Sequence, residues 1–165
     1  MMSASSVDLD QDPRSIVGTR ILDAPRELVF AAFTDPKHLA QWWGPTGFST
    51  TTSAFDFRPG GVWRFVMHGP DGRNYKNFIT FDEIVRPERI VSHHSGSEDG
   101  GNDDVETVLF RTTITLKDIG GKTRLTWRGD FPSAAERDRV IREHGAAKGL
   151  EQNLARLAAF IAAQS

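Results

Sequence analysis

Four turn signals divide the centre of this chain into short segments, and this feature constrains the fold more than any other. They are Arg58-Pro59-Gly60-Gly61, Gly69-Pro70-Asp71-Gly72, Arg86-Pro87-Glu88 and Gly120-Gly121. Glycine and proline adopt the backbone angles that tight turns require. Between the turns apolar and polar residues alternate, most clearly over residues 62–68, as is typical of half-buried strands. The sequence therefore predicts antiparallel strands at residues 15–22, 50–57, 62–68, 74–85, 89–94, 105–117 and 122–130.

Helical patterns flank these strands. Two short helices are predicted after the first strand, one opened by Ala24-Pro25 and one over residues 36–42 with Asp35 as its N-terminal cap. Residues 134–162, rich in Ala, Glu, Arg and Leu, are predicted to form one long helix. Helices segregated from antiparallel strands indicate an α+β fold, in which a curved sheet grips the long helix and leaves space for a pocket. The apolar stripe of that helix consists of Leu150, Leu154, Leu157 and Ile161.

Composition narrows the functional classes. The 165 residues suit one domain, predicted over residues 15–165, after a polar, disordered tail at residues 1–14. The net charge of -2, with scattered basic residues, argues against nucleic acid, and no apolar run is long enough to cross a membrane. The absence of cysteine excludes disulfides and cysteine zinc sites. Metal-binding histidine motifs and phosphate-binding loops are also lacking, so we expect no metal and no organic cofactor. We expect the protein to be cytoplasmic and to be a monomer or a homodimer.

Two adjacent tryptophans, Trp42 and Trp43, precede the helix-ending pair Gly44-Pro45. Neighbouring residues do not share one face of a helix, so the two rings should meet different environments. One ring could close the mouth of a cavity while the other anchors the short helix. Alternatively, both rings pack at the helix end against the sheet.

Large apolar side chains in the predicted strands form a second group of candidate ligand-binding residues. We expect them either to line a lipophilic cavity or to fill the core, because alternation fixes their common face but not the space beside it. The helix around Gly149 and Asn153 would form the opposite wall. The set consists of Trp63, Phe65, Met67, Phe78, Phe110 and Trp127.

His93 and His94 are consecutive in a predicted strand and should point to opposite faces. The inward imidazole could orient a ligand carbonyl or hydroxyl, because neutral histidine both donates and accepts hydrogen bonds. Structural roles for both histidines are the alternative. The acidic segment at residues 98–104 lacks the spacing of a calcium loop and is predicted to be solvated. For an enzyme, the candidate acids and bases are His93, His94, Asp82, Glu83 and Glu106.

Four segments resemble one known family. They are DAPRELVFAAFTDPKHLAQWWGP at residues 23–45, FDFRPGGVWRFVMHGPDG at residues 55–72, IVRPERIV at residues 84–91 and GLEQNLARLAAFI at residues 149–161. Together they resemble the START-like superfamily, also called SRPBCC or helix-grip proteins. Within it they are most similar to the homologues of the activator of the 90-kDa heat-shock protein ATPase. The resemblance covers about residues 15–163.

The resemblance implies the helix-grip fold and, as its first functional expectation, binding of a small lipophilic molecule without catalysis. An enzyme of the cyclase, dehydratase or hydrolase type and a chaperone partner in the stress response are the alternatives. Gly149-Leu150 stands where the family often has Gly-Trp, so we expect a roomier or differently shaped pocket. His94 occupies a strand position that is often aromatic in the family, which favours it as the inward histidine.

Overall fold

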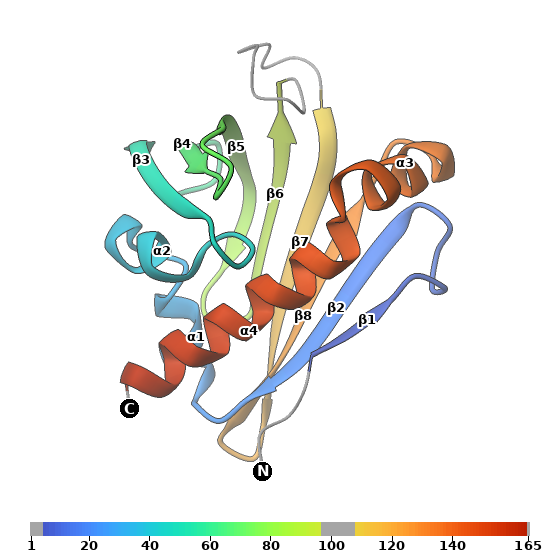
Figure 1. Ribbon diagram of the computed structural model, residues 1–165. Helices are drawn as coiled ribbons and strands as arrows, with labels where there is room; N and C mark the ends of the chain where they lie inside the picture. Colours follow the sequence, from blue (N-terminus) through green and yellow to red (C-terminus); the bar gives the residue numbers. More distant parts are fainter. Residues whose placement is uncertain (1–4, 97–107, 165) are drawn as a thin grey trace.

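The computed structural model describes residues 5–96 and 108–164, in which eight strands form one antiparallel sheet (Figure 1). The spatial order of the strands is β1-β2-β8-β7-β6-β5-β4-β3. The α+β class and the antiparallel sheet are therefore confirmed. The strands are β1 (Ser6–Asp8), β2 (Ser15–Leu22), β3 (Ser49–Phe55), β4 (Val62–His68), β5 (Asn74–Val85), β6 (Arg89–Ser95), β7 (Val108–Ile119) and β8 (Lys122–Asp130). The helices are α1 (Arg26–Ala31), α2 (Pro36–Trp42), α3 (Ala134–His144) and α4 (Ala146–Gln164).

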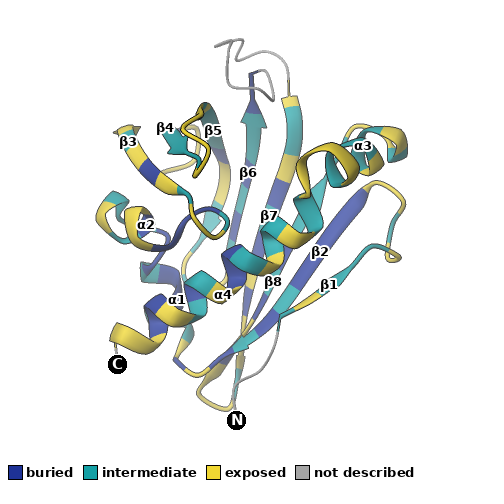
Figure 2. Cartoon of the chain, viewed as in Figure 1, coloured by how far each residue is buried: buried dark blue, intermediate teal, exposed yellow. Residues whose placement is uncertain are grey.

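The helix α4 crosses one face of the curved sheet (Figure 1). Its residues Leu154, Leu157 and Ile161 are buried, and Leu150 packs partly buried against the same core. The prediction that this stripe faces the sheet is confirmed. Figure 2 shows buried positions along α4 but none along α3. No helix in the described ranges is both long enough and apolar enough to cross a membrane.

Helix α4 packs very close to the sheet at Gly18 of β2. A Cβ atom at this position would lie 2.8 Å from Cδ2 of Leu150 and 2.9 Å from Cδ1 of Leu154, closer than side-chain carbons pack. Glycine in a strand often marks such a close approach. The missing side chain therefore lets the helix rest directly on the strand backbone.

The prediction of one helix over residues 134–162 is wrong, because α3 ends at Gly145 and a separate helix, α4, begins at Ala146. This glycine has φ 61° and ψ 38°, and its N–H donates to the carbonyls of Val140 and Ile141. A left-handed glycine of this kind is a common helix end. Helix α3 begins at the cap residue Ser133, whose hydroxyl accepts a hydrogen bond from the N–H of Glu136.

The prediction of a disordered tail over residues 1–14 is wrong for residues 6–8, which form the edge strand β1 beside β2. The segment after β1 is held by Arg137 of α3, whose Nη1 donates to the carbonyls of Leu9 at 2.5 Å and Ser15 at 3.1 Å. Pairing and side-chain contacts from elsewhere in the chain thus order a polar stretch. The acidic segment at residues 98–104 and the start of the strand predicted from residue 105 lie outside the described residues.

Candidate ligand-binding cavity

A cavity of about 420 Å³ lies between the sheet and the helices α3 and α4. Cavities that bind small molecules typically measure roughly 300–1,000 Å³ and have mostly apolar walls with a few polar groups. Aliphatic side chains such as Ile16 and Leu150 and the thioether of Met67 add to its apolar surface. Aromatic side chains supply much of the rest of the wall: Trp43, Phe48, Tyr75, Phe110, Trp127 and Phe131.

The two adjacent tryptophans do meet different environments. Trp42 is fully buried, and its indole N–H donates to the carbonyl of Ala32 at 3.1 Å. Trp43 lies beyond the end of α2 and lines the cavity, where its ring is 5.3 Å from that of Trp127. The chain direction changes between the two residues because Trp43 already has extended backbone angles. Trp42 therefore anchors α2 in the core, and Trp43 belongs to the cavity wall.

Six of the predicted ligand-binding residues line the cavity: Trp43, Met67, His94, Phe110, Trp127 and Asn153. Trp63 and Phe65 face the same side but fill the core, with their rings stacked 3.9 Å apart and both packed against Trp43. For these two residues the core alternative is the one that the geometry supports. Gly149 also stays outside the lining, because the space beside it is occupied by Pro45, whose Cγ is 3.5 Å from the position of a Cβ.

The placement of Phe78 in the cavity is wrong. Phe78 pairs across the sheet with Arg64, whose guanidinium lies 4.5 Å from the centre of the Phe78 ring. The inward positions of β5 are taken by Ile79 and Phe81, which are buried in the core. Because successive strand residues point to opposite faces, Phe78 must lie on the outer face.

The two histidines of β6 face opposite sides, as predicted, and His94 is the inward one. His94 lines the cavity with its ring stacked on Phe110 at 4.3 Å. On the outer face, Nδ1 of His93 lies 2.8 Å from a carboxylate oxygen of Asp82, which also pairs with Arg111 at 3.3 Å.

Burial is the main cause that lowers the pKa of His94 to about 3, and the neighbouring His93 adds to the effect. The imidazole is therefore neutral at physiological pH. Its Nδ1 is buried without a hydrogen-bond partner in the described part of the chain. A neutral, unpartnered imidazole in an aromatic wall suits a hydrogen bond to an uncharged group.

The segment between α2 and β3, residues 43–48, is fastened to α4 by polar side chains that the sequence reasoning missed, apart from Asn153. Asn153 accepts a hydrogen bond from the N–H of Gly44 at 3.1 Å, and Gln152 accepts one from the N–H of Thr46 at 3.2 Å. Arg156 donates to carbonyl groups of the same segment. Partial burial lowers the pKa of Arg156. The usable signal was the run Gly-Pro-Thr-Gly, which leaves backbone groups without partners of their own and so requires donors and acceptors from elsewhere.

The fold and the cavity define a helix-grip protein of the START-like superfamily. The chain belongs to the family described as "Activator of Hsp90 ATPase homolog 1-like protein", whose model matches residues 23–162. No curated protein sequence is similar enough to this chain to count as a match.

Solved structures agree with this assignment. The solution NMR structure of a protein from Arthrobacter aurescens is 28% identical, with 96% of this chain and 91% of that chain covered and a TM-score of 0.85. A crystal structure of a protein from Chromobacterium violaceum is 29% identical, with 91% and 98% covered and a TM-score of 0.74. The AHSA1 protein from Silicibacter pomeroyi, at 22% identity, 92% and 99% coverage and a TM-score of 0.72, supports the fold alone.

Proposed function

We propose that this protein binds a small, uncharged lipophilic molecule in the cavity between the sheet and α4, without catalysing a reaction on it. The observation that carries the proposal is the mainly apolar wall of the cavity of about 420 Å³, in which apolar side chains outnumber polar ones such as Asn77 and Glu136 and enclose the neutral His94. Burial of an apolar ligand against aromatic side chains supplies affinity, at roughly 25 cal/mol for each Å² removed from water. A carbonyl or hydroxyl of the ligand would satisfy the imidazole of His94 and fix the orientation of the ligand.

The positions of the candidate acids and bases support binding rather than catalysis. His93 and Asp82 lie on the outer face of the sheet, and Glu83 is exposed and paired with Arg89. Glu106 lies outside the described residues. His94 does face the cavity, but a pKa of about 3 makes it a weak base at neutral pH, whereas general bases work best with a pKa near the working pH.

Displacement of a neutral fluorescent probe tests the proposal. N-phenyl-1-naphthylamine should bind the folded protein with enhanced emission, and neutral naphthalene derivatives should displace it. Native mass spectrometry of the purified protein should show whether a small molecule of the host is retained. Absence of probe binding, together with absence of a retained molecule, would remove the support for a ligand-binding role.

A co-chaperone role is the alternative that the family description suggests. Copurification with Hsp90 and stimulation of its ATPase by this protein would favour that role. Mutation can also distinguish ligand binding from the co-chaperone role. Replacement of cavity residues such as Phe110 should abolish probe binding and leave a chaperone contact on the outer surface intact. The cytoplasmic location and the monomeric or dimeric state remain predictions from composition.

A further inference from the structure

The backbone of residues 43–48 has an unusual set of partners. Nη1 of Arg156 lies within hydrogen-bond distance of four carbonyl oxygens: those of Trp43 at 3.2 Å, Gly44 at 2.9 Å, Pro45 at 3.1 Å and Phe48 at 3.1 Å. One nitrogen of a guanidinium carries only two hydrogens, so these bonds are shared between acceptors. The oxygen atoms thus converge on one positive charge from a helix more than one hundred residues away in the chain.

The same segment supplies cavity wall. Trp43, Pro45 and Phe48 all line the cavity, while Arg156 does not. Gly44 and Gly47 have φ values of 104° and 90°, so the segment follows a path that other residues rarely adopt. A segment of this kind has few backbone hydrogen bonds of its own, and its position depends on the side chains that bind it.

We propose that Arg156 is a positioning residue for the ligand site: through its bonds to residues 43–48 it holds Trp43 and Phe48 against the bound molecule. This inference rests on the proposed ligand-binding function. Arg156 acts with Asn153 and Gln152, and the three lie at helical spacing on the side of α4 that meets the segment. Gly149, one turn earlier on the same side, lies beside Pro45.

The test compares Arg156→Met with Lys148→Met in the full-length chain. Both variants remove one cation from α4, but Lys148 is exposed and has no ring in the cavity wall to position. Arg156→Met should raise the dissociation rate of N-phenyl-1-naphthylamine about tenfold, because carbonyl groups lose a charged donor. Lys148→Met should leave that rate unchanged. Arg156→Lys, which keeps the charge but lacks the planar fork, should fall between them.

Amide hydrogen exchange gives a readout that does not require a ligand. The N–H of Gly44 and that of Thr46 should exchange about tenfold faster in Arg156→Met, while exchange in the core strand β8 stays the same. Equal probe release and equal exchange in Arg156→Met and the wild type would overturn the inference. Faster exchange with unchanged probe release would also overturn it, since the arginine would then have only a structural role.

Failure of the proposed function is distinguishable from these outcomes. If the wild type binds no probe, the ligand-binding proposal fails, and with it the positioning role. If Arg156→Met does not fold, as judged by circular dichroism, the comparison of Arg156→Lys with Lys148→Met decides by the same two measurements.

Discussion

The two sides of the cavity that lie opposite the sheet, residues 43–48 and helix α3, are built very differently. The segment at residues 43–48 is bound by Gln152, Asn153 and Arg156 of the core helix α4. Helix α3, which supplies Glu136, Val140 and His144 to the cavity, contains no buried residue. One side of the cavity is therefore fixed to the core, whereas the other is attached mainly near the start of α3.

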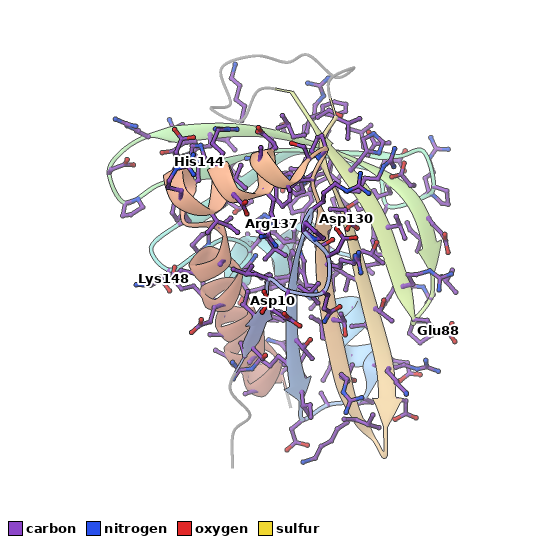
Figure 3. All side chains as sticks on the ribbon, turned by 90° about the vertical axis from the view of Figure 1, so that its right-hand side faces the viewer. Asp10, Glu88, Asp130, Arg137, His144 and Lys148 are labelled. Carbon is purple, nitrogen blue, oxygen red and sulfur yellow. The ribbon has the colours of Figure 1, made fainter. Side chains whose placement is uncertain are left out.

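The attachment of α3 is concentrated near its start. Figure 3 shows Arg137 turned toward the segment after β1, with His144 at the opposite end of the helix. Beyond His144 comes Gly145, where, apart from the adjoining backbone, no atom of the described residues lies within 4 Å of the position of a Cβ. Local opening of a protein begins where few apolar contacts are made. We therefore expect a ligand to enter beside α3 and to rest against residues 43–48.

The largest expected effect is a difference in stability between mutations in α4 and in α3. Leu157→Ala should lower the free energy of unfolding by about 2–5 kcal/mol, because Leu157 is fully buried under the sheet. Val140→Ala in α3 should cost less than about 1 kcal/mol, because this valine is only partly buried and faces the cavity. Urea denaturation of both variants measures the difference. Similar losses at the two positions would show that α3 belongs to the same core as α4, and the contrast between the two sides would be lost.

The next effect is the pH dependence of stability that His94 causes in the wall of the cavity. The pKa of His94 falls from its ordinary 6.5 to about 3 in the folded protein, so only the unfolded chain takes up this proton between those values. Stability contributed by the neutral histidine is therefore complete above about pH 6.5 and is lost as the pH falls, with a slope approaching about 1.4 kcal/mol per pH unit.

His94→Phe should remove this slope. Urea denaturation at pH 7, 6, 5 and 4 should show a smaller loss for the variant than for the wild type, with His93→Phe as the control on the outer face. Burial keeps His94 neutral between about pH 5 and 8, so ligand binding should not vary through the charge of this residue in that range. A slope that disappears in His93→Phe and persists in His94→Phe would contradict the assignment.

The smallest effect distinguishes the two glycines at the start of α4. Gly145→Ala should destabilise the protein by about 1 kcal/mol, because its φ of 61° is unfavourable for a residue with a Cβ. Gly149→Ala should be neutral or stabilising by up to about 1 kcal/mol, because this glycine is inside the helix and a Cβ would make an ordinary contact with Pro45. Thermal denaturation tests both, and equal signs would show that Gly145 is not the point where α3 and α4 separate.

Strong local patterns allowed the sequence to predict much of the fold. The observed bounds of β4, β5, β8 and α2 equal the predicted ones, because each is framed by turn residues and has a clear period. The break at Gly145 was missed because Gly145 and Gly149 look alike in a helical pattern, and only the backbone angle separates them. The strand β1 was missed because three residues carry little local signal and depend on pairing with β2.

The candidate site was harder to predict, for two physical reasons. Alternation in β5 left Phe78 ambiguous, because aromatic residues occur on both faces of that strand. The binding of residues 43–48 by Arg156 joins positions 108 to 113 residues apart, and an arginine on a helix is usually solvated. His94 was placed correctly because a two-residue repeat forces one of two adjacent histidines inward.

The glycine at position 18 has a consequence for how cavities of this kind change size. Leu150 and Leu154 meet the strand backbone there, and Leu150 also lines the cavity, so the contact between helix and strand lies beside the hollow. A single added methyl group at that point would either push the ends of Leu150 and Leu154 aside or lift the helix from the strand, and both changes alter the shape of the hollow that Leu150 lines. Variation at this one position would then change the shape of the hollow while the aromatic residues of its wall stay the same.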